Sequence, residues 1–325
     1  MSIFLSIASY CDPVLTFTIQ RAIATARDPG ALHFGVVEQT PPDWPRLDAT
    51  VAGIARLSYL RFDPADARGP CFARSIAMTL YDGEDWFFQI DSHMDFEPGW
   101  DATLADQARA LMPGRRGVAI SSYPNAFVFD DKGNAVPGPM PGKALAHVVK
   151  PGSSFDPEHP VLSFEAHPVD SREPVPGFHV GAGCLFAPGD VVQLIPYDPF
   201  LYFHGEEQAF ALRLFTHGWD IFHMPDLPVY HLYNLPGSGT PPRPMHWDPA
   251  HEAQRKIGWW LYEQRARGRL THLVAGSPFG VYGLGKVRTV ADYAAFCGID
   301  YAARTLSPQA FKAIGFLPPP TEAPA

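Results

Sequence analysis

Hydrophobic and polar positions in the first 125 residues form short apolar runs separated by amphipathic stretches. Residues 3–9 (IFLSIAS) are apolar almost throughout, which is typical of a strand buried on both faces. A helix is predicted after Asp12 and Pro13, because aspartate can cap a helix and proline suits its first position. Strands that alternate with helices indicate an α/β protein with a mainly parallel sheet and helices on both faces. The pattern predicts further strands at 32–37, 57–62, 86–90 and 118–121, and further helices at 72–80 and 103–112.

The rest of the chain is less regular. Residues 130–176 are rich in Pro, Gly, Asp and His and are predicted to form loops, with or without a hairpin. Gly218 and Gly268 are predicted to end two helices. We expect one domain over residues 1–300 and a C-terminal extension over 301–325. The later elements are predicted as a strand or turn at 179–186, helices at 206–216, 252–267 and 290–296, and a strand at 219–224.

Composition narrows the class of protein. Hydrophobic residues make up 46% and aromatic residues 13% of the chain, which excludes disorder for most of it. The formal net charge is −9 and no basic run occurs, which argues against nucleic acid as a main partner. No stretch approaches the ~20 apolar residues of a membrane span. The four cysteines lie far apart, as in a protein with reduced thiols. These features predict a cytoplasmic protein.

The most informative polar residues follow the predicted strand 86–90. Asp91 and His93 come directly after it, and residues two apart in extended chain point to the same side. Ligands of α/β sheets bind beyond the carboxyl ends of the strands, so this pair can close on one cation such as Mn²⁺. His231 ends another apolar segment and can supply a third ligand. The alternative interpretations are an ordinary polar turn for Asp91 and His93, and a structural histidine for His231.

Several motifs of other enzyme families are missing from the sequence. No G-x-x-x-x-G-K-[ST] loop occurs, which argues against a P-loop nucleotide hydrolase. Residues 181–183 (GAG) lack the third glycine of a dinucleotide-binding fingerprint. Neither the G-x-S-x-G nucleophile elbow nor the H-E-x-x-H zinc motif is present.

Five short motifs occur in an order that resembles a known family. Together they resemble glycosyltransferase family 60, the N-acetylglucosaminyltransferases whose eukaryotic members modify hydroxyproline on a cytoplasmic polypeptide. The resemblance runs from the first strand to about residue 300. It implies a Rossmann-like GT-A fold, which is similar to that of the polypeptide N-acetylgalactosaminyltransferases. The motifs are SIASY (6–10), GVVEQ (35–39), QIDSHM (89–94), GEEQ (205–208) and YHLY (230–233).

The resemblance also implies roles for individual residues. Asp91, His93 and His231 match the D-x-H pair and late histidine that hold Mn²⁺, with Mg²⁺ as the alternative ion. Glu206 and Glu207 match an acidic pair at the start of the acceptor-side helix, where a catalytic role is expected. The residues implied to contact the UDP-sugar are Ser9, Tyr10, Gln39, Arg74, Asp91, Gly181, Ala182 and Gly183.

Two positions depart from the patterns of these families. Cys11 stands where family 60 usually has an arginine, and Asn234 stands where the galactosaminyl relatives have one. A contact to the diphosphate is therefore expected from elsewhere in the chain. Lys286 and Arg288 are candidates, with solvated surface charges as the alternative interpretation.

The resemblance implies a retaining, Mn²⁺-dependent transfer of a sugar, GlcNAc in the first instance, from a UDP-sugar to an acceptor hydroxyl on a protein or glycan. A front-face reaction, in which the departing phosphate takes the acceptor proton, needs no protein base. Two alternatives are a metal-dependent hydrolase of nucleotide-sugar diphosphates and a non-catalytic glycan- or nucleotide-binding module.

Overall fold

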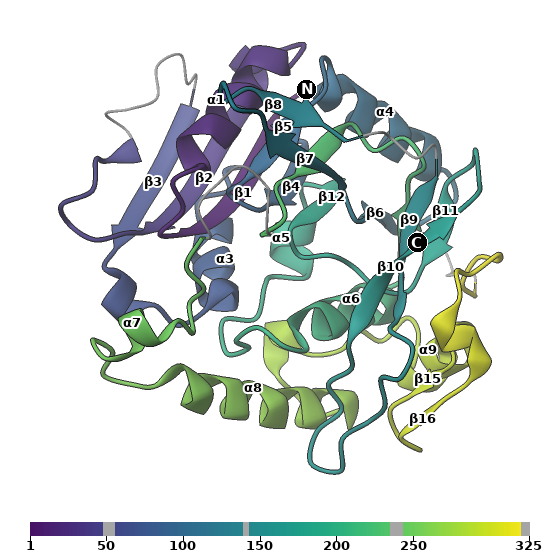
Figure 1. The fold of residues 1–325 in the computed structure, drawn as a ribbon. Helices are drawn as coiled ribbons and strands as arrows, with labels where there is room; N and C mark the ends of the chain where they lie inside the picture. The colour runs from purple at the N-terminus through teal and green to yellow at the C-terminus, as the bar shows by residue number, and fades with distance from the viewer. Residues whose placement is uncertain (48–55, 139–142, 235–242, 320–325) are drawn as a thin grey trace.

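The computed structural model describes residues 1–47, 56–138, 143–234 and 243–319. Within these ranges, eight strands form one large sheet, which crosses the upper part of the molecule in Figure 1. The strand order is β11 (Val175–Gly177), β13 (Trp219–His223), β6 (Gly117–Ile120), β12 (Cys184–Pro188), β4 (Trp86–Ile90), β1 (Ile3–Tyr10), β2 (Leu32–Gln39) and β3 (Arg56–Phe62).

Most neighbours in this sheet are parallel. β1 pairs in parallel with both β2 and β4, β2 with β3, and β6 with β13. β12 is antiparallel to β4 and β6, and β11 is antiparallel to β13. The predicted mainly parallel sheet is thus confirmed. Its two antiparallel strands are β12, between β6 and β4, and β11, at one edge.

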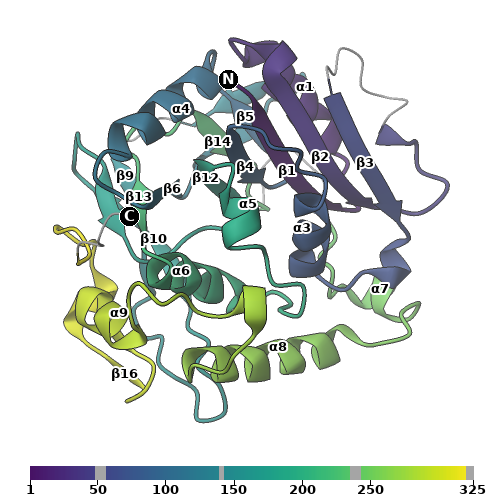
Figure 2. The same ribbon diagram turned by 180° about the vertical axis from the view of Figure 1, so that it is seen from behind.

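Helices cover both faces of the sheet, as predicted. Alternate residues of a strand point to opposite faces, and in β1 Leu5 and Ile7 pack on one side while Phe4 packs on the other. The first side is covered by α1 (Leu15–Thr25) and α4 (Trp100–Leu111). The second side is covered by α3 (Pro70–Met78), α5 (Val191–Leu194), α6 (Glu206–Thr216) and α8 (Trp259–Val274), and the view from behind shows α6 and α8 together below the sheet (Figure 2). None of the described helices is long and apolar enough to cross a membrane.

Smaller units complete the fold. β9 (Ala144–Val149) and β10 (Phe164–Val169) form an antiparallel hairpin inside the segment that was predicted as loops. A second sheet has the order β5 (Met94–Phe96), β14 (Val229–His231), β7 (Asn125–Phe129) and β8 (Ala135–Pro137). The remaining elements are α7 (Pro249–Glu252), α9 (Val290–Cys297), β15 (Ile299–Asp300) and β16 (Thr305–Leu306).

The C-terminal residues continue from the last helix. β15, which ends at residue 300, pairs with β16, which lies beyond the predicted boundary. Ala310 and Ile314 are buried with α9 in one apolar cluster. The division into a domain over 1–300 and an extension over 301–325 stays a prediction, and residues 320–325 lie outside the described part of the chain.

The helix predicted at 252–267 is wrong in both of its ends. α8 begins at Trp259 and continues through Gly268 to Val274. Ala266, Leu270 and Leu273 are buried along one side of α8. A glycine inside a helix costs only about 1 kcal/mol relative to alanine, so burial of the following leucines outweighs it.

Candidate functional site

The candidate site lies where β4 ends. Asp91 follows the last residue of this strand, and its backbone N–H donates to the carbonyl of Gly183 at 3.1 Å. His93 comes two residues later, just before β5. The predicted position of this pair, at the carboxyl end of a buried central strand, is thus borne out by the backbone.

Strand pairing brings a distant histidine to the same place. β14 is antiparallel to β5, with His231 opposite Met94, the residue after His93. The backbone N–H of Leu232 donates to the carbonyl of His93 at 3.0 Å. The two imidazole rings consequently lie edge to face, with centroids 4.7 Å apart.

Asp91, His93 and His231 form a cluster suited to a metal ion. One ligand atom from each lies within 4.8 Å of the others, and no other such group of three His, Cys, Asp or Glu residues occurs in the described chain. Nε2 of His231 is 3.3 Å, and Nε2 of His93 3.9 Å, from Oδ2 of Asp91. Burial opposes ionisation of Asp91, but the hydrogen bond from His231 and the nearby His93 and Arg74 hold its pKa far below the usual value. One carboxylate and two imidazoles suit a divalent ion such as Mn²⁺, with coordination positions left for a substrate.

Asp12 orients one of these imidazoles. Its Oδ2 accepts a hydrogen bond from Nδ1 of His93 at 2.7 Å and another from the hydroxyl of Ser92 at 2.6 Å. A proton on Nδ1 leaves the lone pair of Nε2 free, which is the usual arrangement of a metal-ligating histidine with a carboxylate behind it. From the sequence, Asp12 is predicted to cap a helix. Its Oδ1 does accept the N–H of Val14, but α1 begins only at Leu15.

Arg74 joins the metal cluster to the acidic helix start. Its Nη2 donates to Oδ1 of Asp91 at 3.1 Å, and its Nη1 donates to Oε1 of Glu206 at 2.7 Å. Glu206 is buried and also accepts hydrogen bonds from the Cys71 thiol at 2.7 Å and the Tyr197 hydroxyl at 3.1 Å. Burial raises the pKa of Glu206, while Arg74 opposes that shift. One oxygen of Glu206 therefore holds Arg74, and the other is occupied by Cys71 and Tyr197.

The glycine turn packs directly against the cluster. A Cβ atom on Gly183 would lie 2.2 Å from Oδ2 of Asp91, so only glycine leaves this carboxylate in place. Oε1 of Glu207 accepts the backbone N–H of Ala182 at 2.7 Å, which ties α6 to the turn. The predicted residues 181–183 and the acidic pair thus lie beside Asp91.

A cavity of about 290 Å³ opens on the other side of the cluster. The hydroxyl of Tyr10 accepts a hydrogen bond from Arg255 at 2.9 Å, and burial raises the pKa of this tyrosine to about 12. Ser9 and Gln39 are buried at the ends of β1 and β2, where the Gln39 amide donates to the carbonyl of Ser9 at 3.3 Å, and neither lines this cavity. The lining includes Tyr10, Asp12, Arg74, Asp91, His93, His231 and Arg243.

Arg243 lines this cavity and is not among the residues predicted from the sequence. Its side chain is 8% exposed, and its Nη2 donates to the carbonyl of Leu232 at 2.5 Å. Its Nη1 is buried without a hydrogen-bond partner in the described ranges. A buried guanidinium with an open donor beside a metal cluster is suited to an anionic ligand. Asn234 donates to the carbonyl of Arg243 at 3.4 Å, so the two positions are neighbours in space.

Lys286 and Arg288 lie elsewhere. Arg288 is buried, forms an ion pair with Asp220 at 2.7 Å and donates to the carbonyl of Trp219. Trp219 is the first residue of β13, which runs parallel to β6. The Arg288–Asp220 ion pair therefore lies where β13 begins, whereas Asp91 lies where β4 ends. Lys286 is exposed in the segment before Arg288. The interpretation of Arg288 as a solvated surface charge is also wrong, because the residue is buried.

Comparison with known proteins identifies the family. The sequence model described as Glycosyltransferase (GlcNAc) matches residues 47–303, which is most of the chain. The chain belongs to this GlcNAc glycosyltransferase family. A search of curated proteins gives no match.

Among solved structures, this glycosyltransferase is similar in fold to GalNAc-T7, whose crystal structure contains UDP, GalNAc and Mn²⁺. The TM-score is 0.56 at 14% identity over 95% of this chain, which spans 59% of the GalNAc-T7 chain. This likeness agrees with the predicted α/β architecture of GT-A glycosyltransferases. S. aureus TarS 1-349 matches at 15% identity over 71% of this chain and 60% of its own, but the TM-score of 0.41 is too low to bear on the fold.

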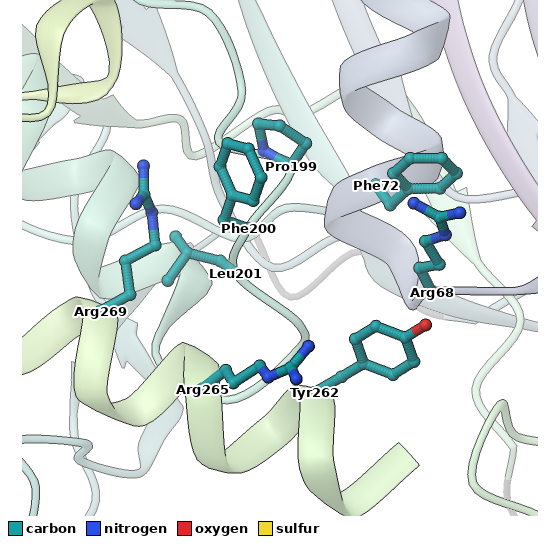
Figure 3. Close-up of a pocket in the computed structure, with 8 residues that line it drawn as sticks. All are labelled: Arg68, Phe72, Pro199, Phe200, Leu201, Tyr262, Arg265 and Arg269. Atoms are coloured by element: carbon teal, nitrogen blue, oxygen red, sulfur yellow. The ribbon is translucent and has the colours of Figure 1, made fainter. Parts of the chain in front are cut away.

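The glycosyltransferase has a further cavity of about 490 Å³ between α3 and α8 (Figure 3). Arg68, Arg265 and Arg269 line it together with Phe200 and Tyr262. None of the described lining residues is a histidine or a carboxylate. This cavity therefore lacks metal-ligating side chains like those of Asp91, His93 and His231.

Proposed function

We propose that this glycosyltransferase transfers GlcNAc from UDP-GlcNAc to an acceptor hydroxyl, with retention of configuration and with Mn²⁺ or Mg²⁺ held by Asp91, His93 and His231. The observation that carries the proposal is the three-ligand cluster at the end of β4 in a chain of this family. The chemistry that a bound divalent ion supplies is stabilisation of the negative charge that grows on the leaving diphosphate.

The chain's own residues prepare the site for that charge. Asp12 fixes the ring of His93, and Gly183 leaves room for the carboxylate of Asp91. We assign the diphosphate to the cavity lined by Arg243, whose open Nη1 donor replaces the arginine that the galactosaminyl relatives have at position 234. Tyr10 belongs to the nucleoside end of the same cavity, and Ser9 and Gln39 support it from the ends of β1 and β2.

We place the donor sugar on the other side of Asp91, next to Arg74, the glycine turn 181–183 and the start of α6. A cavity of about 370 Å³ lies there, lined among others by Arg74, Asp91, Ala182, Gly183, Glu206 and Glu207. Arg74 is held in position by Glu206 and can donate to sugar or phosphate oxygens once Asp91 binds the ion.

The contacts of Glu206, whose two carboxylate oxygens are both occupied, favour a front-face reaction. Glu206 is bound to Arg74, Cys71 and Tyr197, and Glu207 is bound to the N–H of Ala182. In the proposed step, the bond from the anomeric carbon to the phosphate oxygen breaks while the acceptor oxygen bonds to that carbon on the same face. The acceptor proton passes to the departing phosphate oxygen, so neither glutamate acts as the base, and because the acceptor oxygen attacks the anomeric carbon directly, neither acts as a nucleophile.

A donor panel tests this proposal. UDP-GlcNAc, UDP-GalNAc, UDP-glucose and GDP-mannose are each added with Mn²⁺, with Mg²⁺ and with a chelator, and thermal unfolding and sugar release are recorded. We expect UDP-GlcNAc with Mn²⁺ to stabilise the protein by about 2–3 kcal/mol near saturation, according to RT ln(1 + [L]/Kd), and chelation to remove the effect. Asp91→Asn is the matched control that removes the ligand charge at constant size.

The outcomes separate the candidate activities. Sugar release that rises with hydroxyl acceptors supports a transferase, whereas release that no acceptor raises indicates a hydrolase. Binding without any turnover indicates a non-catalytic module. Stabilisation by UDP-GlcNAc that is equal with and without the chelator would refute the metal site.

A further inference from the structure

A small pocket that Arg243 does not line adjoins the metal cluster at Asp91 and His231. Its volume is about 140 Å³, and a dry cavity of roughly this size holds a molecule no larger than benzene. A nucleoside or a whole sugar with its substituents is larger than benzene, so the pocket suits one substituent of a larger ligand. Its lining includes Asp91, Tyr123, His147, Gly181, His231 and Tyr233.

His147, on β9, lines this pocket, and the described part of the protein leaves both of its ring nitrogens unsatisfied. Its side chain is 1% exposed, and neither ring nitrogen has a hydrogen-bond partner in the described part of the chain. The ring lies 4.1 Å from that of Tyr123, centroid to centroid, and 5.1 Å from that of His223. Buried polar groups without partners are rare, because leaving one unpaired is unfavourable. A ligand group that pairs with His147 would remove that penalty.

Space beside His147 depends on a glycine. A Cβ atom on Gly181 would lie 2.8 Å from Cε1 and 3.2 Å from Nε2 of the His147 ring. The His147 ring is therefore packed against the backbone of Gly181, and both Gly181 and Tyr123 line the pocket. Gly181 belongs to the turn that also packs against Asp91 through Gly183.

The chemistry of the lining selects a neutral group. Burial and the nearby His223 and His179 lower the pKa of His147 well below its usual value, so the imidazole is neutral. A neutral imidazole offers one N–H donor and one acceptor. The carboxylate of Glu207 also lines the pocket and disfavours an anion there. Tyr123 and Tyr233 contribute aromatic surface for an apolar part. A group with one donor, one acceptor and a methyl matches all of these features.

The position of the pocket indicates which atom carries this group. The sugar carbon next to the anomeric carbon is C2, so its substituent lies nearest to a metal-bound diphosphate. We infer that the pocket receives the 2-acetamido group of the donor sugar, and that His147 and Tyr123 make the enzyme prefer N-acetylhexosamines over hexoses. This inference rests on the proposed function.

The test compares two donors that differ at C2. kcat/KM for UDP-GlcNAc and for UDP-glucose is measured in the wild type, in His147→Phe, which keeps a flat ring without hydrogen bonds, and in His147→Asn, which keeps a donor and an acceptor. We expect His147→Phe to reduce the preference for UDP-GlcNAc by about tenfold or more, and His147→Asn to restore part of it. Gly181→Ala provides a second test, since its Cβ would displace the His147 ring and should lower kcat/KM for UDP-GlcNAc more than for UDP-glucose.

His33→Asn is the matched control, because His33 is likewise a buried histidine but pairs with Glu84 and Ser58 and does not line the pocket. It should lower the melting temperature without changing the donor ratio. If the wild type uses no UDP-sugar, the proposed function fails. Two results would overturn the inference while the proposed function stands, provided that the wild type uses UDP-GlcNAc. In the first, the His147 and Gly181 variants lower kcat/KM for both donors by the same factor. In the second, they change only the KM of the acceptor.

Discussion

Nδ1 of His93 donates to the carboxylate of Asp12 at 2.7 Å, an interaction between two residues 81 positions apart in the chain. It sets the ring so that Nε2 lies on the side of Asp91, at 3.9 Å from Oδ2. The carboxylate just after β1 thereby orients the ring of a proposed metal ligand just after β4. Because these two strands are neighbours in the sheet, the arrangement depends on their parallel register.

Asp12→Asn should weaken metal binding. The amide cannot hold the Nδ1 proton as the carboxylate does, so we expect the Kd for Mn²⁺ to rise about 10- to 100-fold, as measured by calorimetric titration. Asp101→Asn is the control, since Asp101 is also buried and accepts the backbone N–H groups of Arg27 and Asp28 far from the site. An unchanged Kd in Asp12→Asn, with the fold intact, would show that Asp12 does not position His93.

Gly183→Ala should behave like the loss of a ligand. The added Cβ would displace the carboxylate of Asp91, from which it would lie 2.2 Å. We expect kcat/KM to fall by about 10²–10⁴, as for Asp91→Asn, with a matching loss of Mn²⁺ affinity. Gly268→Ala is the control, because a Cβ there meets no atom within 4 Å. Normal Mn²⁺ affinity in Gly183→Ala would mean that Asp91 is not a ligand or that the turn moves freely.

Arg243→Gln should weaken binding of UDP. A charge-assisted hydrogen bond from a buried guanidinium contributes about 1.5–3 kcal/mol, so the Kd of UDP with Mn²⁺ should rise about 10- to 100-fold. Lys286→Gln removes the same charge from an exposed position and serves as the control. Equal effects of the two variants would indicate a general loss of positive charge rather than a contact to the diphosphate.

Acid should destabilise the fold through buried histidines. Burial lowers the pKa of His223 to about 4, so between about pH 6.5 and 4 the unfolded chain binds a proton that the folded chain does not. The contribution of neutral His223 to the free energy of unfolding is therefore fully present above pH 6.5. It is lost as the pH falls through this window and amounts to at most about 3 kcal/mol. Urea unfolding at several pH values should show a shallower decline for His223→Asn. Parallel pH profiles for the two proteins would contradict the assignment.

Local sequence patterns predicted much of the framework. Apolar runs and their flanking residues placed β1, β2 and β4, and the helix at 206–216 has the predicted ends. The carboxylate and imidazole that follow β4 could be found because both belong to one short segment whose geometry is local. Where a glycine was taken as the end of a helix at 268, the pattern failed, since burial of later leucines outweighs its weak local preference.

The sequence by itself determined the alternation of strands and helices and the D-x-H pair at the end of a buried strand, because these follow from side-chain periodicity over a few residues. Only the tertiary structure decided that β14 pairs with β5 so that His231 faces His93, that Asp12 lies behind His93, and that Arg243 and His147 line cavities beside them. Such contacts join residues tens to more than a hundred positions apart. They arise from the register of paired strands and the packing of the whole core, which no local pattern encodes.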